Sequence, residues 1–250
     1  MYQIKPSGLT NKIIVKKKKF IKKSNRQVDY FLDRQNENHF YQQVQNVVFI
    51  LVPTKIIKKW NYWISQMPYY PNTKTLDIQT LNEQGMEKVI DLIKQLHAQK
   101  LDLKLFDPQA FLELFTNKVG VIEQLKPWTA KIDAIIKNYY DDVSPVVSHN
   151  DLIPENFLIK DQQMYLIDFE YVSLNHYLFD YASFMTESLK KEQNPTFLKL
   201  LNLNNQELIK LTELMQYQNY LWAHWAKYMY QNSKNEIFLA IMENKIARLN

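Results

Sequence analysis

The chain has 250 residues, enough to bury a substantial core as one large domain or as two unequal lobes. It contains no cysteine, which excludes disulfides, thiolate metal sites and cysteine nucleophiles. The formal net charge is +5 and the sequence pI is near 9.0, so attraction to polyanions has to be considered.

The N-terminus lacks the apolar region of a signal peptide, and its longest early apolar run, Val47 to Val52, is too short to span a bilayer. We therefore expect a cytoplasmic protein with no transmembrane segment.

The first sixty or so residues are predicted to form mostly strands, with one helix. Strands are expected where β-branched and aromatic residues cluster, at Tyr2 to Ile4, Lys12 to Lys16, Phe20 to Lys23, Val47 to Val52 and Ile56 to Ile64. A helix is expected from about Asp29 to Gln45, with four apolar residues available for an inward face. These are Phe31, Leu32, Phe40 and Val44.

From about Met67 onward the apolar spacing becomes helical. The expected helices are Leu81 to Gln99, Pro108 to Thr116, Val121 to Tyr139 and most of Asn204 to Leu249. A small β-rich lobe, residues 1–64, thus precedes a larger helical lobe, residues 65–250. With only three glycines and no Gly/Ser linker, we expect a short ordered hinge near Tyr62 to Ser65 and a cleft between the lobes.

The most basic segment is Lys16 to Lys19, followed by Lys22 and Lys23. It lies between the apolar patches IIV and FI, so a solvated hairpin turn explains it without a nucleic-acid partner. No nucleic-acid binding is expected from charge alone.

The stretch SHNDLIPENFLI, residues 148–159, begins a segment rich in polar ligands. Two short apolar runs, Phe157 to Lys160 and Met164 to Ile167, predict a β-hairpin. Folding about Gln162 sets Asn156 beside Asp168, where Mg²⁺ could bind between their oxygens and nucleotide phosphates.

Asp151 lies one loop earlier, and Pro154 discourages a helix there, so the loop stays open toward a substrate hydroxyl. A carboxylate that accepts a hydroxyl proton, with an Asn and an Asp that hold metals, is what phosphoryl transfer requires. The alternative is that each residue serves only a turn or a cap. We interpret His149 as structural, packing and fixing the loop.

HNDLIPENF (149–157) followed by LIDFEYVSLNHYLFDYASFMTE (166–187) resembles the choline/ethanolamine kinases, a branch of the aminoglycoside-phosphotransferase and protein-kinase-like fold. Further similar segments are SGLTNK (7–12), LDRQNE (32–37), Leu96-His97 and YLWAHWAKY (220–228). The resemblance covers most of the chain. It implies an α+β, two-lobed protein-kinase-like fold.

The resemblance also implies roles for individual residues. Asp151 would be the catalytic base, and Asn156 and Asp168 the Mg²⁺ ligands. Lys23 would contact the ATP phosphates and pair with Glu37, although a slip of one residue in strand register would put Lys22 in its place. The loop PSGLTN would cover the phosphates through Ser7, Gly8, Thr10 and Asn11.

Trp222 and Trp225 lie three residues apart on an expected helix and so share a face. Two such tryptophans are often simply core, but in the resembled family an L-W-x-x-W motif lines the choline pocket. Tyr171 and Glu187 match family positions near the cationic head, and ring faces with a carboxylate suit a quaternary ammonium. A further tyrosine of the family is missing around Ile241 or Met242.

The expected activity is phosphorylation of the hydroxyl of choline to phosphocholine, with ATP and Mg²⁺, the hydroxyl binding at Asp151. Ethanolamine, thiamine and aminoglycosides are alternative substrates on the same fold. An alternative of a different class is a catalytically silent basic binding module.

Overall fold

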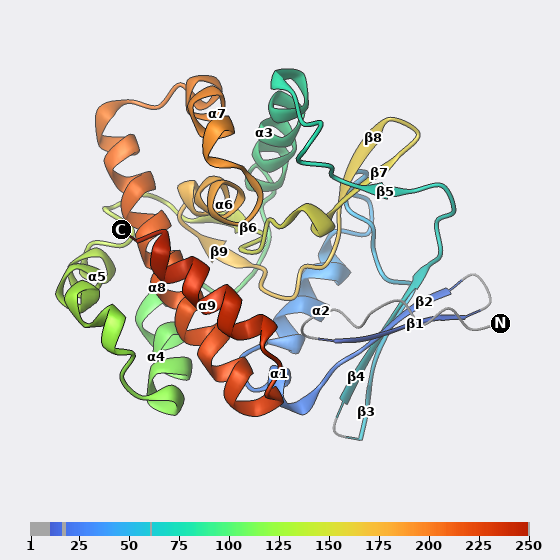
Figure 1. Ribbon diagram of the computed structural model, residues 1–250. Coiled ribbons are helices and arrows are strands. Elements are labelled where there is room, and N and C mark those ends of the chain that lie inside the picture. Colours follow the sequence, from blue (N-terminus) through green and yellow to red (C-terminus); the bar gives the residue numbers. More distant parts are fainter. Residues whose placement is uncertain (1–10, 17–18, 61, 250) are drawn as a thin grey trace.

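The computed structural model describes residues 11–16, 19–60 and 62–249. A twisted antiparallel sheet near the N-terminus stands beside a larger, mainly helical part (Figure 1). The strand expected at Tyr2 to Ile4 lies outside the described residues.

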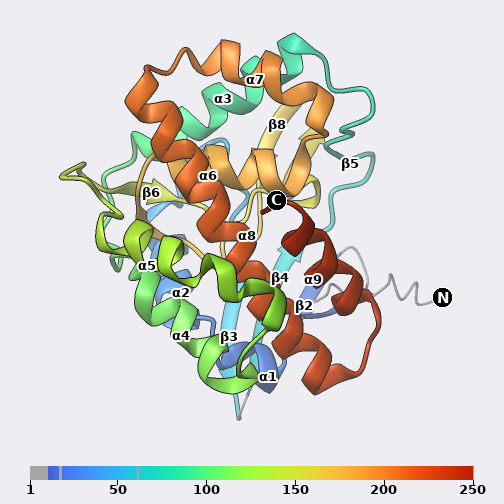
Figure 2. The same cartoon turned by 60° about the vertical axis from the view of Figure 1, so that its left-hand side comes forward.

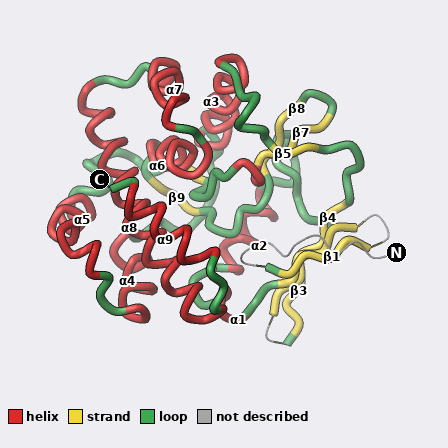
Figure 3. Tube along the Cα trace, viewed as in Figure 1, coloured by secondary structure: helices red, strands yellow, loops and turns green. Residues whose placement is uncertain are grey.

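Over the described residues, the N-terminal sheet has four strands in the order β1-β2-β4-β3. They are drawn in yellow beside the N-terminus in Figure 3. They are β1 (Lys12–Lys16), β2 (Lys19–Lys23), β3 (Lys55–Lys59) and β4 (Tyr62–Pro68). The single strand expected at Ile56 to Ile64 is therefore wrong, because the chain turns back near Trp60, whose φ is 55°. The hinge expected at Tyr62 to Ser65 is also wrong, since these residues belong to β4, which pairs on both sides.

The long helix expected from Asp29 to Gln45 is divided into α1 (Arg26–Asp29) and α2 (Arg34–Gln43). Asp33 begins α2, because its Oδ1 accepts hydrogen bonds from the backbone N–H groups of Gln35 (3.1 Å) and Asn36 (3.0 Å). The four apolar residues predicted to face inward are all buried, at Phe31, Leu32, Phe40 and Val44.

The segment Val47 to Val52 is not a strand. Its pairing is an isolated bridge from Ile50 to Leu166, beside which the Leu51 N–H donates to the Leu166 carbonyl at 3.2 Å. Phe49 and Ile50 of this run are buried, whereas Val48 is 85% exposed.

Helices dominate the rest of the chain (Figure 2). The α-helices are α3 (Glu83–His97), α4 (Pro108–Val119), α5 (Thr129–Lys137), α6 (Leu178–Ser183), α7 (Asn194–Leu201), α8 (Asn205–Ser233) and α9 (Ile237–Ala247). Shorter turns are the 3₁₀ helices η1 (Glu123–Trp128), η2 (Pro154–Asn156) and η4 (Lys191–Gln193) and the π-helix η3 (Phe184–Ser188). The helices predicted at 81–99 and 108–116 are confirmed. The one predicted at 121–139 is interrupted, since η1 contains Pro127.

Two small sheets complete the helical part. One joins β5 (Lys74–Thr75), β7 (Phe157–Lys160) and β8 (Gln163–Leu166), and the other joins β6 (Val146–Ser148) and β9 (Ser173–Asn175).

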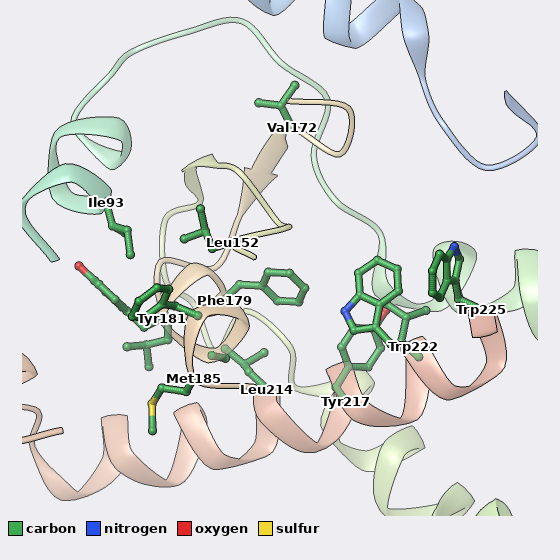
Figure 4. Packing of buried hydrophobic residues seen from close by; sticks show 14 of the residues in the cluster. Ile93, Leu152, Val172, Phe179, Tyr181, Met185, Leu214, Tyr217, Trp222 and Trp225 are labelled. Atoms are coloured by element: carbon green, nitrogen blue, oxygen red, sulfur yellow. The ribbon is translucent and has the colours of Figure 1, made fainter. Parts of the chain in front are cut away.

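The core of the helical part forms around α8. Leu214 and Tyr217 of α8 are fully buried and lie near Phe179 of α6 (Figure 4). Helix α9 turns back along α8 after Lys234, whose φ of 56° ends the longer helix (Figures 1 and 2). Among the described helices, none combines the length and the apolar character needed to cross a membrane.

Candidate active site

Helix α6 fixes the loop that carries Asp151. The Asp180 carboxylate is fully buried and accepts the backbone N–H groups of His149 (3.0 Å) and Asn150 (2.8 Å). One turn later, the Ser183 hydroxyl accepts the N–H of Leu152 at 3.0 Å. Backbone amides on both sides of Asp151 are thus bound to one helix, which sets the position of the loop.

His149 and Asn150 hold the same loop from the other side. The Asn150 side chain donates to the Tyr171 carbonyl at 2.7 Å, and its own φ is 68°. His149 Nε2 lies 2.9 Å from the Ile167 carbonyl, while Nδ1 accepts the Asp151 N–H at 3.3 Å. Burial lowers the pKa of His149 and keeps the ring neutral, consistent with the structural role expected for it.

The predicted hairpin is confirmed, with β8 beginning at Gln163, one residue earlier than expected. Asp161 and Gln162 both have positive φ, 49° and 64°, as a two-residue hairpin turn requires. Beyond the paired strands, the Ile167 N–H donates to the Asn156 carbonyl at 3.0 Å, so Asp168 follows directly after this contact.

Asn156 is joined to Asp151. Its Nδ2 donates to the Asp151 carbonyl at 2.7 Å and to the Asp151 carboxylate at 3.1 Å. Burial raises the pKa of Asp151 to about 8, and the carboxylates of Glu170, Glu187 and Asp168 add to the effect. A carboxylate with such a pKa is suited to accept a proton near neutral pH.

Lys22, and not Lys23, reaches the acidic residues after β8. Its ammonium contacts Asp168 and lies 2.6 Å from Glu170 Oε2. Burial opposes its charge, but Asp168 and Glu170 raise the pKa of Lys22 above its usual value. Lys23 lies on the opposite face, its Nζ 3.7 Å from the centre of the Tyr62 ring. Because neighbouring strand residues alternate in direction, the predicted register was one residue off.

Glu37 pairs with Arg34 and not with Lys23. One guanidinium nitrogen of Arg34 lies 2.8 Å from Glu37 and 3.2 Å from Glu170, and another donates to Asn11 at 2.9 Å. Burial disfavours the ionised form of Glu170, but Lys22 and Arg34 outweigh it and lower its pKa to about 2. Arg34 and Glu170 were not predicted as site residues, although Arg34 lies in the similar segment 32–37 and Glu170 in the similar segment 166–187.

Of the four residues expected to cover phosphates, Asn11 is described. It is buried, and its Nδ2 donates to Glu170 at 2.9 Å. Ser7, Gly8 and Thr10 lie outside the described residues.

Three aromatic rings form a corner on the helical side. Tyr171 and Trp222 meet at 5.5 Å with their planes 78° apart, and Trp222 and Trp225 meet at 5.9 Å and 85°. Figure 4 shows both indoles on the same side of α8, as their spacing predicted. The buried Trp225 Nε1 has no hydrogen-bond acceptor among the described residues.

Glu187, in η3, forms an ion pair with Lys245 of α9. The lysine side chain is 5% exposed and the glutamate 17%. Lys245 was not predicted as a site residue.

The donor set suits Mg²⁺ shared with a nucleotide. The hydrogen bonds of Asn156 use Nδ2, so Oδ1 is the atom that can act as ligand, together with the Asp168 carboxylate. Over the described part of the chain, no three His, Asp or Glu side chains form a complete metal site. Mg²⁺ commonly binds through one or two protein oxygens plus phosphates and water.

Comparison with known proteins gives a family. Residues 3–249 match the family model described as choline/ethanolamine kinase. The chain is 28% identical to Protein LicA of Haemophilus influenzae over 186 residues, covering 67% of this chain and 69% of that protein. It is also 27% identical over 132 residues to a probable ethanolamine kinase of Arabidopsis thaliana, covering 52% of this chain and 27% of that protein.

The fold is shared with solved structures. The choline kinase LicA from Streptococcus pneumoniae superimposes with a TM-score of 0.75 at 18% identity, covering 96% of this chain and 89% of that one. These likenesses, together with those to aminoglycoside phosphotransferases, confirm the predicted two-lobed, protein-kinase-like α+β fold.

Proposed function

Because the chain belongs to the choline/ethanolamine kinase family and is thus a small-molecule kinase, we propose that it phosphorylates the hydroxyl of choline with ATP and Mg²⁺. The products would be phosphocholine and ADP. The observation that carries the proposal is a half-buried carboxylate, Asp151, bound to Asn156 in a loop anchored on α6.

Asp151 would act as the base. Its raised pKa, about 8, gives the carboxylate a strong affinity for the proton that the attacking hydroxyl loses. The contacts of Asp180 and Ser183 with the flanking backbone hold Asp151 in place, so little reorganisation is needed when the hydroxyl arrives.

The nucleotide would bind beside Lys22. Its ammonium contacts both Asp168 and Glu170, and Arg34 forms a second ion pair with Glu170. Asn156 and Asp168 would hold Mg²⁺, which neutralises charge on the transferring phosphoryl group. LicA has been solved in complex with AMP, and that structure superimposes here with a TM-score of 0.79.

Choline would bind with its cationic head at the aromatic corner. The rings of Tyr171, Trp222 and Trp225 are nearly perpendicular to their neighbours, so they offer faces in more than one direction to a single cation. Glu187 supplies a carboxylate whose charge reaches Asp151. The cationic head of choline would thus bind at the aromatic rings and Glu187, and its hydroxyl would bind at Asp151.

Ethanolamine is a second candidate for a specific reason. Glu187 accepts a hydrogen bond from the primary ammonium of Lys245, and ethanolamine carries the same donor group. A quaternary ammonium has no N–H to offer.

The test is ADP release from ATP and Mg²⁺ with choline, ethanolamine, thiamine and an aminoglycoside, each followed by mass measurement of the product. We expect choline to give the highest kcat/KM, and Asp151→Asn to lower its turnover by about a hundredfold or more. Chelation of Mg²⁺ should stop the reaction. ADP release that no alcohol stimulates would contradict the proposal, and a clear preference for another alcohol would replace choline as substrate.

A further inference from the structure

Lys245 is a charged residue on the buried side of α9. Phe238, two helical turns earlier, packs on Trp225 with ring centroids 5.6 Å apart, and Ile241 and Met242 between them pack against the core. Positions spaced three, four and seven residues apart share one helix face. Lys245 thus stands where this face would otherwise continue with an apolar side chain, and it is only 4% exposed.

The groups around the Lys245 ammonium are those of the substrate site. It contacts Glu187, the charge of Asp151 also acts on it, and Arg248 opposes it from the same helix. Burial lowers the pKa of Lys245, and the two carboxylates act against that effect. Arg248 itself donates to the Thr186 carbonyl at 2.7 Å, which fastens the end of α9 to η3 beside Glu187.

We propose that Lys245 is a specificity-determining residue that pairs with Glu187 and competes with the cationic head of the substrate for that carboxylate. The inference rests on the proposed function in one respect, namely that the substrate carries a cation. It concerns a residue that the family resemblance did not identify.

Competition follows from the charges. A buried carboxylate that already has a hydrogen-bonded ammonium partner attracts a second cation less, since the two cations repel each other. Among the described residues, no lysine or arginine lies over the ring of Tyr171, Trp222 or Trp225. Lys245 therefore makes recognition of the cation depend less on Glu187 and more on these three rings. A neutral alcohol of the same shape does not need Glu187 and is indifferent to the lysine.

The experiment compares wild type with Lys245→Met and Lys245→Gln. Both should lower the KM for choline, by about three- to tenfold for the methionine variant, within the range of coupling between contacting residues. The KM for ATP and the affinity for 3,3-dimethylbutan-1-ol, the neutral isostere of choline, should stay within about twofold. Lys199→Met, which removes a lysine 79% exposed on α7, is the matched control and should change none of these values.

A double-mutant cycle identifies the partner. In a Glu187→Gln background, Lys245→Met should no longer lower the KM for choline, because the carboxylate under competition is gone. Lys245→Gln keeps an N–H donor toward Glu187, so it provides a second test if the methionine variant does not fold. Thermal melting followed by circular dichroism verifies that each variant is folded. An unchanged or higher KM for choline in the folded variants would show that the ion pair only supports the site, which overturns the inference.

Binding of tetramethylammonium, measured by calorimetry, separates this inference from the proposed function. It requires no phosphoryl transfer, so tighter binding to Lys245→Met than to wild type would support the competition even if choline were not the alcohol phosphorylated. Equal or weaker binding would overturn it even in an active choline kinase.

Discussion

Asp151 should make the protein less stable than it would be with a neutral residue in its place. Its ordinary pKa of 3.8 rises to about 8 in the folded protein, through burial first and then through Glu170, Glu187 and Asp168. Because the folded pKa lies above the unfolded one, the folded state binds the proton more tightly. Stability is therefore greatest below about pH 4 as far as this group is concerned, and is lost as pH rises toward 8.

The size of the effect follows from the two pKa values. At about 1.36 kcal/mol for each pKa unit, the loss has an upper limit of about 6 kcal/mol. Asp151 is only half-buried, so water lowers the cost, and we expect about 2 kcal/mol at pH 8. Asp151→Asn removes this charge and still offers an oxygen to Asn156, so it should raise the melting temperature by about 4–8 °C for a chain of this size.

The assay is thermal unfolding from pH 5 to pH 8.5 in EDTA and without nucleotide, so that no bound cation stabilises the carboxylate. Wild type should lose stability relative to Asp151→Asn across this range, and the two curves should converge toward acid pH. Asp102→Asn, at a side chain that is 96% exposed, is the matched control and should follow wild type. An Asp151→Asn protein that is no more stable than wild type at pH 8 would refute the reasoning about burial and charge.

Three further predictions concern the site. Lys22→Met should lower kcat/KM for ATP by about tenfold or more, because it removes a charge-assisted contact, while Lys23→Met should change this value by no more than about twofold. Equal effects of the two variants would contradict the strand register that directs Lys22 toward Asp168. Asp168→Ala should raise the Mg²⁺ concentration needed for half-maximal activity more than Asn156→Ala, because a carboxylate contributes a full charge, and the reverse order in Mg²⁺ titrations would count against it. Trp222→Leu should raise the KM for choline by about two- to thirtyfold and leave the neutral isostere unaffected; a lowered melting temperature without that selectivity would assign the ring to the core.

The parts of the site that the sequence predicted correctly depend on local pattern. The hairpin from Phe157 to Leu166 arises from two apolar runs around a two-residue turn, and beyond it the Ile167 N–H, next to Asp168, donates to the Asn156 carbonyl. The division of the expected helix also has a local signal, because Asp33 is an aspartate that can cap the helix beginning at Arg34. The apolar spacing across Asp33 nevertheless predicted one continuous helix.

The remaining errors concern contacts between distant segments. Lys22 and Lys23 are chemically identical, so only the pairing of β2 with β4 decides which one faces Asp168. Arg34 and Glu170 are 136 residues apart, and no periodicity relates them. Their pairing depends on how α2 packs against the turn after β8, which only the folded structure reveals.

The carboxylates of Asp151, Asp168 and Glu170 affect both the stability of the folded protein and its proposed binding of cations. Lys22 and Arg34 satisfy Glu170 so well that its pKa falls to about 2, whereas burial raises the pKa of both Asp168 and Asp151. Asp168 has Lys22 as an ion-pair partner, whereas the Asp151 carboxylate accepts its hydrogen bond from the neutral amide of Asn156 and is compensated less. On the proposed function, this uncompensated charge costs folding free energy that binding of Mg²⁺ and a cationic alcohol would recover. A centre neutralised by additional lysines would be more stable and would bind both of them less well.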